Sequence, residues 1–129
     1  MKRKTSIALV LALILILIFS CKKENTDLLI GKWKLVKTFS FMGGNYFPEI
    51  QEQRIEEYTK KKRILFDFEG NEIVRSDYKA TNSIINVFGK EINGDQWDFN
   101  IDYWFVNDTL KLRHSGGFEY YDEFLIRIK

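Results

Sequence analysis

The segment that most constrains the fold covers residues 96–106, with the sequence QWDFNIDYWFV. Apolar and polar residues alternate along it, and one side is formed by Trp97, Phe99, Ile101, Tyr103 and Phe105. A period of two is the repeat of a β-strand with one buried and one solvated face, whereas a helix has a period near 3.6. Asn93 and Gly94, just before this segment, tolerate positive φ and favour a two-residue hairpin turn. The pattern therefore predicts antiparallel sheet.

Five other segments carry strand signals separated by turn residues. They cover residues 32–41, 63–80 (a hairpin around Gly70–Asn71), 83–92, 109–114 and 118–129. By contrast, residues 48–61 contain few β-branched residues and many helix formers, so we predict one short helix or irregular loop there. The charge run at residues 60–63 is expected to be a solvated face. Because the connections are short, the predicted fold class is all-β, an antiparallel up-and-down β-barrel of about 7–8 strands.

Aromatic residues make up 16% of the chain, which is enough to line the interior of such a barrel. A barrel of about eight strands can be filled by its side chains or can hold one small ligand. Both alternatives stay open, and in the second the long excursion between Gly43–Gly44 and Tyr58 is a candidate lid. The aromatic residues that we expect inside, and that would be the ligand-binding residues, are Phe66, Phe68, Trp97, Phe99, Tyr103 and Phe105.

The N-terminal residues follow a separate pattern. Three basic residues at positions 2–4 precede an unbroken apolar run of 13 residues from Ile7 to Phe19. A membrane-spanning helix needs roughly 20 apolar residues, whereas a basic head, a short apolar run and a small residue are typical of a secretory signal. We expect three parts: a lipoprotein signal peptide that is removed (residues 1–20), a flexible tether (21–28) and a barrel domain (29–129).

The sequence IFSC at residues 18–21 resembles a bacterial lipobox, although Phe19 replaces the small or branched residue usual at that place. The resemblance implies that a signal peptidase cuts before Cys21 after its thiol has been diacylated. Two or three acyl chains hold a protein on a membrane, whereas one anchors it only marginally. Lys22 follows the cysteine where inner-membrane retention signals have aspartate, which implies the outer membrane of a Gram-negative envelope. The alternative is an ordinary signal peptide or uncleaved anchor with an incidental cysteine.

Removing the signal changes the charge balance. The chain has 20 basic and 18 acidic residues, and loss of the three basic residues at positions 2–4 leaves 17 against 18. Without a basic excess, nucleic-acid binding loses its compositional support. The single cysteine excludes an internal disulfide and Cys-x-x-Cys chemistry. His114, the only histidine, lies beside Ser115, but no Gly-x-Ser-x-Gly surrounds any serine, so we expect no catalytic residue, no metal site and no cofactor.

The sequence LIGKW at residues 29–33 places Gly31 and Trp33 at the start of the first predicted strand. This Gly-x-Trp resembles the signature of lipocalins and the wider calycins. The resemblance implies that the tryptophan plugs one barrel end and packs against a basic residue of the last strand, for which Arg127 is the candidate. Arg127 falls opposite the apolar face of its strand. Either a bulge near Tyr120–Tyr121 resets the alternation, or another residue covers the tryptophan.

These patterns support two functional hypotheses. The first is a lipid-anchored envelope lipoprotein whose lipocalin-like barrel binds a small hydrophobic ligand. The second is a protein-interaction module, such as an envelope assembly, immunity or inhibitor-type lipoprotein, with a filled barrel and no ligand. An exposed apolar patch near Phe41, Tyr46 and Phe47 would favour the second. An enzyme is not expected.

The anchoring hypothesis predicts the outcome of replacing the cysteine. Cys21→Ala removes the only thiol in the chain, so acylation should be abolished and the uncleaved precursor should accumulate. Metabolic labelling with palmitate and the electrophoretic size of the product measure the two effects. Lys22→Ala, which keeps the thiol, is the control and should still be labelled. Unchanged labelling and processing of the Cys21→Ala chain would contradict the hypothesis.

Overall fold

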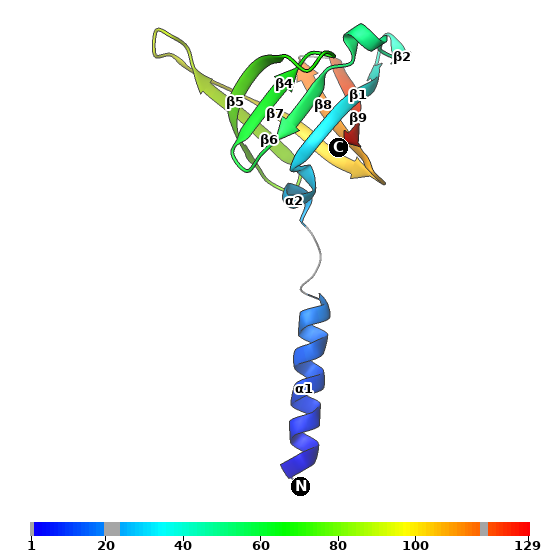
Figure 1. Cartoon of the computed structure of the whole chain (residues 1–129), viewed down its shortest axis with the longest axis vertical. Coiled ribbons are helices and arrows are strands. Elements are labelled where there is room, and N and C mark those ends of the chain that lie inside the picture. The colour runs from blue at the N-terminus through cyan, green and yellow to red at the C-terminus, as the bar shows by residue number, and fades with distance from the viewer. Residues whose placement is uncertain (1, 20–23, 117–118) are drawn as a thin grey trace.

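The structure is a computed structural model that describes residues 2–19, 24–116 and 119–129. Within these residues the chain forms two α-helices, one 3-10 helix and nine β-strands (Figure 1). The helices are α1 (Lys2–Phe19) and α2 (Asn25–Leu29), and the 3-10 helix covers Ile50–Glu52. The strands are β1 (Gly31–Ser40), β2 (Gly44–Tyr46), β3 (Ile55–Tyr58), β4 (Lys62–Phe66), β5 (Glu72–Ala80), β6 (Ile84–Lys90), β7 (Gln96–Val106), β8 (Thr109–Gly116) and β9 (Glu119–Ile128).

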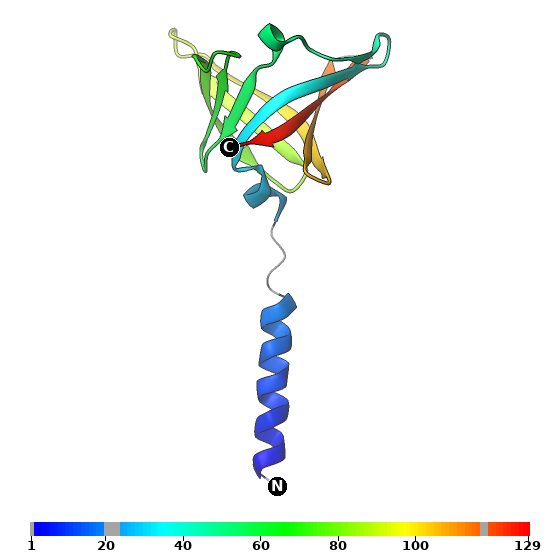
Figure 2. The same ribbon diagram turned by 45° about the vertical axis from the view of Figure 1, so that its right-hand side comes forward.

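The strands form one antiparallel barrel. Each strand from β3 to β9 pairs with the next one along the chain. β1 pairs with β3 on one side and β9 on the other, so that eight strands of the described chain close into a ring. β2 is an extra strand that forms a hairpin with the end of β1. Figures 1 and 2 show the barrel from two sides, with α2 at one end. The predicted all-β barrel is confirmed.

β3 is a strand that the sequence pattern did not predict. The excursion near residues 48–61 contains the expected short helix at Ile50–Glu52, but Ile55–Tyr58 pairs with both β1 and β4. Glu56 and Tyr58 are buried, and they alternate with less buried neighbours as a strand requires. Two neighbouring strands supply backbone hydrogen bonds to β3, and this tertiary gain outweighs the weak local preference for helix. Without β3 the ring would not close.

The two ends of the barrel differ. We call the end that carries α2 the α2 end, and the opposite end, which carries the β1–β2 hairpin, the open end (Figure 1). The interior toward the α2 end is a packed apolar cluster whose members are at most 7% exposed. Its buried members are Leu29, Trp33, Leu35, Tyr58, Tyr78, Ile85, Val87, Ile101, Tyr103, Leu110, Leu112 and Leu125.

Gly31, Trp33 and Arg127 meet at the α2 end. The indole N–H of Trp33 donates to the carbonyl of Leu29 at 2.8 Å. The guanidinium carbon of Arg127 lies 4.3 Å from the centre of the Trp33 ring, a cation–π contact. Arg127 also donates to two backbone carbonyls of the segment that leads into β1. The first and last strands are therefore tied together at this end, and Arg127 packs on the tryptophan as expected.

Arg127 packs on Trp33 because the polar face of β9 is its inner face, and at the barrel end its side chain is exposed. Leu125 shares the face of Arg127 and is fully buried, whereas Phe124 lies on the outer surface. The ammonium groups of Lys37 and Lys111 lie 4.7 and 4.5 Å from the centre of the Phe124 ring. These long side chains cover the aromatic ring from outside, so an apolar face of this strand does not have to face the core.

β9 pairs without a register shift at Tyr120–Tyr121, where a bulge is one of the two alternatives that the sequence leaves open, and the irregularity lies in β1. Leu35 pairs with Leu125 of β9 and Lys37 pairs with the preceding residue of β9, so the register shifts between Leu35 and Lys37 and Val36 is the extra residue. The shift turns Lys37 to the outer face, which is the usual effect of a bulge on the following side chains.

The N-terminal parts have two different outcomes. α1 lies in the predicted signal peptide, and none of the helices in the described residues is long and apolar enough to cross a membrane. Cys21 lies outside the described residues. Part of the tether expected over residues 21–28 is the start of α2, where the Asn25 amide donates to the carbonyl of Asn82 at 2.9 Å, and the following Leu29 is fully buried. The folded unit therefore includes Asn25.

Gly31→Ala should destabilise the barrel strongly. Gly31 has a φ of 140°, and a Cβ atom there would lie 2.3 Å from Nη1 of Arg127. We expect the free energy of unfolding to fall by about 3 kcal/mol, because the backbone is strained and the guanidinium is displaced from the indole. Urea titration measures the loss.

Gly70→Ala is the matched control. Gly70 also has a positive φ, of 90°, but nothing lies within 4 Å of a Cβ atom built there. Only backbone strain applies, so the loss should be about 1 kcal/mol. Equal losses for Gly70→Ala and Gly31→Ala would contradict the role given to the contact with Arg127.

Candidate functional site

The interior of the barrel is unfilled toward the open end. Strand register places Val74, Phe99 and Tyr121 on the inner face, yet they are 43%, 44% and 44% exposed. Ile101 and Leu125, which lie nearer the α2 end on β7 and β9, are fully buried. Inner positions of a small barrel lose their contact with water where side chains fill the space. These inner positions are therefore in contact with solvent, and we call the solvent-exposed interior toward the open end the lumen.

The four candidate residues on β7 all lie on the inner face. Tyr103 is buried and donates its hydroxyl hydrogen to a backbone carbonyl at 2.5 Å, and the Phe105 ring lies 5.8 Å from that of Trp33. Trp97 and Phe99 stack with ring centres 6.0 Å apart, nearer the open end. Tyr103 and Phe105 thus belong to the packed half and Phe99 to the lumen, whereas Trp97 lies nearer the open end but is partly buried and also packs against the core cluster. Ligand contact by any of them stays a prediction.

The expectation that Phe66 faces the interior is wrong, and that for Phe68 stays a prediction. Phe66 pairs with Ile55 on the outer face, where the ammonium group of Lys32 lies 5.7 Å from the centre of its ring. Phe68 lies in the turn after β4 and is 42% exposed. The aromatic alternation of this segment marks its outer face, because Arg63 takes the inner position beside Tyr58.

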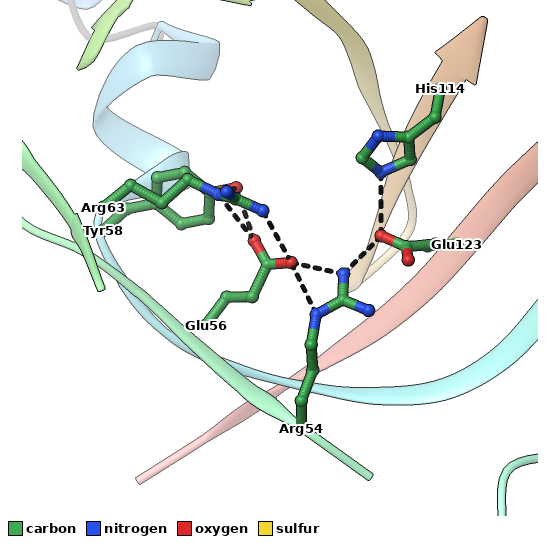
Figure 3. A network of polar contacts seen from close by, with 6 residues as sticks. All are labelled: Arg54, Glu56, Tyr58, Arg63, His114 and Glu123. Atoms are coloured by element: carbon green, nitrogen blue, oxygen red, sulfur yellow. Dashed lines mark hydrogen bonds and ion pairs between the residues drawn. The ribbon is translucent and has the colours of Figure 1, made fainter. Parts of the chain in front are cut away.

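A polar network of Arg54 and residues from β3, β4, β8 and β9 lies on the inner face of the barrel and extends from the packed half toward the lumen (Figure 3). At its centre the fully buried Glu56 accepts hydrogen bonds from two guanidiniums and one phenol. Arg54 donates from Nε and Nη2 to Oε1 at 3.1 and 2.6 Å. Arg63 donates from Nη2 to Oε1 at 3.1 Å and from Nε to Oε2 at 3.2 Å. The Tyr58 hydroxyl donates to Oε2 at 2.7 Å, so both oxygens of the buried charge are satisfied.

Glu123 connects this cluster to β8. Its Oε2 accepts a hydrogen bond from Nη2 of Arg54 at 2.5 Å and lies 2.9 Å from Nε2 of His114. The His114 ring stacks on that of Tyr121, with centres 4.6 Å apart. Arg54 therefore bridges two carboxylates, and 26% of its side chain is exposed against 8% for Arg63. Arg54 is the guanidinium that faces the lumen.

The network keeps both carboxylates ionised. Burial raises the pKa of Glu56, but the charges of Arg63 and Arg54 outweigh burial, and the pKa lies below its ordinary value. Burial also raises the pKa of Glu123, but hydrogen bonds with His114 and Arg54 outweigh it and lower the pKa to about 2. At neutral pH, two guanidinium charges and two carboxylate charges therefore cancel in the wall.

Sequence reasoning missed this network. Arg54 and Glu56 lie in the segment for which a helix or loop was expected, and Arg63 belongs to the charge run expected to be solvated. That expectation is wrong for Arg63, which is 7% exposed. The available signal was the period of two that relates Arg54, Glu56 and Tyr58. Charged residues at that period usually indicate the outer face of a sheet. Without knowledge of their partners, the pattern would therefore place Arg54 and Glu56 outside the barrel.

The lumen has two unlike walls, one apolar with Val74 and Phe99 and one polar. Such a site suits non-covalent binding of a molecule with one apolar and one hydrogen-bonding part. His114 and Ser115 point to opposite faces of β8, because neighbouring strand residues do, so they do not form a nucleophile–base pair. In the part of the chain that the structure describes, no three His, Cys, Asp or Glu residues lie close enough to hold a metal ion.

Comparison with known proteins found no match: no family model, no curated protein and no solved structure matches the chain. The chemistry of the lumen and the N-terminal sequence are therefore the grounds for assigning a function.

Glu123 should make the barrel less stable in acid. Its pKa is about 2 in the folded chain against the ordinary 4.5, so it adds stability above pH 4.5 that is lost as the pH falls from 4.5 toward 2. The difference corresponds to about 3 kcal/mol. Glu123→Gln should flatten the dependence of the unfolding free energy on pH in that range, as measured by urea titration.

Glu57→Gln is the control for this prediction, because Glu57 lies on the outer face of β3 beside Lys32. It should keep the slope of the unmodified chain. If the Glu123→Gln chain does not fold, NMR titration of the Glu123 carboxyl in the unmodified chain decides the question. A pKa at or above the ordinary value would then contradict the role assigned to Arg54 and His114.

Proposed function

We propose that the chain is a lipid-anchored lipoprotein of a bacterial cell envelope, and that its lipocalin-like barrel binds a small hydrophobic or amphipathic ligand in the open half. The observation that carries the proposal is the exposure of inner-face apolar side chains, above all Phe99, over a packed core. Concave apolar surface with a few polar groups is the usual composition of a small-molecule site.

The apolar wall offers enough surface to matter energetically. An aromatic side chain presents about 200 Å², so the 44% exposure of Phe99 corresponds to about 90 Å². Covering that area contributes about 2 kcal/mol. Val74 and Trp97 add to the same wall. A ligand that covers this wall gains several kcal/mol before any polar contact is counted.

The contact of Arg127 with Trp33, next to Gly31, supports the lipocalin-like assignment, because the resemblance implies this arrangement at one barrel end. The predicted acylation site supports a specific orientation of the barrel relative to the membrane. Cys21 precedes Asn25 by four residues, which span about 14 Å at most. An acylated Cys21 would hold the α2 end beside the membrane, and the lumen would open away from it.

A protein-interaction module of the envelope assembly, immunity or inhibitor type is the second candidate function. The observation that favours it is a group of exposed apolar side chains on the β1–β2 hairpin and the loop after it, with exposures from 50% to 78%. We rank it second because these side chains also stand where a lid over the lumen would need them. They are Phe41, Met42, Tyr46, Phe47 and Ile50.

The ligand-binding proposal predicts saturable binding of an uncharged fluorophore. Titration of the purified chain with N-phenyl-1-naphthylamine should raise the fluorescence of the probe to a plateau. Phe99→Ala should raise the Kd about tenfold, since it removes apolar contact area in the lumen. Phe88→Ala is the matched control, because Phe88 lies on the neighbouring strand with its side chain on the outer face, and it should leave the Kd unchanged.

Two results would count against this proposal. One is the absence of a plateau, and the other is equal weakening by Phe99→Ala and Phe88→Ala. A chain that binds no probe, but that is recovered from native membranes in a complex lost on joint substitution of Phe41 and Phe47 by serine, would support the second candidate instead.

A further inference from the structure

The polar wall contains hydrogen-bonding groups that the network does not use. Nε and Nη2 of Arg54 contact the two carboxylates, whereas its Nη1 makes no hydrogen bond with any residue that the structure describes (Figure 3). Oε1 of Glu123 likewise makes no hydrogen bond with any residue that the structure describes, whereas Oε2 contacts both Arg54 and His114. No fully buried side-chain nitrogen or oxygen atom among the described residues lacks a partner. Both groups are therefore at least partly exposed to solvent.

These two groups are neighbours. Nη2 of Arg54 and Oε2 of Glu123 are 2.5 Å apart, and Nη1 and Oε1 belong to the same planar groups. One donor and one acceptor thus lie close together on the polar wall. In a ring of eight strands the fourth neighbour lies opposite, so β3 faces β7 and β9 faces β5. Arg54, which directly precedes β3, is therefore on the side of the barrel opposite the strand of Phe99, and the strand of Glu123 is opposite that of Val74.

The charges of the wall disfavour an ionic ligand. The guanidiniums of Arg54 and Arg63 are balanced by the carboxylates of Glu56 and Glu123. A ligand anion at Nη1 of Arg54 would also approach the Glu123 carboxylate, and a ligand cation at Glu123 would approach the guanidinium. Separating the existing pairs would leave a buried charge without its partner, which is strongly unfavourable. An uncharged group that both accepts and donates a hydrogen bond meets neither penalty.

We propose that Arg54 and Glu123 form the polar subsite of the lumen and that it binds the carboxamide group of an uncharged amphipathic ligand. The ligand carbonyl accepts a hydrogen bond from Nη1 of Arg54, and the ligand N–H donates one to Oε1 of Glu123. The apolar part of the ligand lies against Val74 and Phe99 on the facing wall. This assignment rests on the proposed ligand-binding function, and it adds the chemical class of the ligand.

The test uses four ligands with the same ten-carbon chain and different ends: decanamide, decanoate, decylamine and decanol. Each displaces N-phenyl-1-naphthylamine from the unmodified chain at neutral pH. Decanamide should act at a concentration about tenfold below the other three. Decanoate and decylamine bring a charge, and the hydroxyl of decanol accepts and donates through a single oxygen, whereas the amide accepts through its carbonyl oxygen and donates through its nitrogen. The order of the four ligands tests the polar subsite without any substitution.

A pair of substitutions then locates the subsite. Arg54→Gln removes the guanidinium that faces the lumen and should abolish the preference for decanamide. Arg113→Gln is the control, because Arg113 lies on the outer face, where it donates to Asp122 from Nε at 2.7 Å and from Nη2 at 2.8 Å. It should keep the preference. If the Arg54→Gln chain does not fold, the ligand order in the unmodified chain decides alone.

The outcomes separate the subsite from the wider proposal. Tightest binding of decanoate or decylamine would overturn the subsite, since the wall would then recognise charge. Equal displacement by all four ligands, or failure of all four to displace a bound probe, would also overturn it while leaving binding in the lumen intact. Failure of the probe itself to bind would instead overturn the proposed function.

Discussion

Closure of the barrel depends on the compensation of one buried charge, the carboxylate of Glu56. β3 completes the ring between β1 and β4, and Glu56 on that strand is fully buried inside. A carboxylate without partners at such a position costs several kcal/mol. Two guanidiniums and a phenol remove that cost, and Arg54 continues the network to Glu123, which is 69 residues away in the sequence. The ring can include β3 because the charges inside it are paired.

The same network separates the interior of the barrel into a packed half and an open half. Toward the α2 end, aliphatic and aromatic side chains fill the barrel, and Leu110, Leu112 and Leu125 are fully buried. Toward the open end, the wall of β3, β8 and β9 carries ionic groups held in fixed positions by their partners, while Phe99 on the facing wall stays exposed. Charged side chains tied to one wall do not collapse across the barrel as apolar ones do, so this half keeps a lumen with two unlike walls.

The outer surface explains why the patterns of β4 and β9 mislead. Both strands have aromatic residues at alternate positions, yet these rings lie outside under the ammonium groups of lysines: Phe66 under Lys32, and Phe124 under Lys37 and Lys111. Apolar alternation shows that a strand has two different faces. It indicates which face is the core only if the polar side chains cannot be paired inside. In this barrel they are paired inside.

The sequence by itself determined the elements that depend on local chemistry. The strand at residues 96–106, the turns at Gly70–Asn71 and Asn93–Gly94, the antiparallel class and the place of Trp33 follow from periodicity, turn residues and a short motif. The N-terminal pattern predicts export and acylation in the same way, although Cys21 lies outside the described residues.

Only the tertiary structure decided the rest: that residues 55–58 are a strand, that Phe66 faces outward, and that Arg54 and Glu123 meet in the lumen. Each of these depends on free energy gained from partners distant in the sequence. A charged residue at a strand position faces water or the core according to whether its counter-charge arrives from another strand, and no local pattern contains that information.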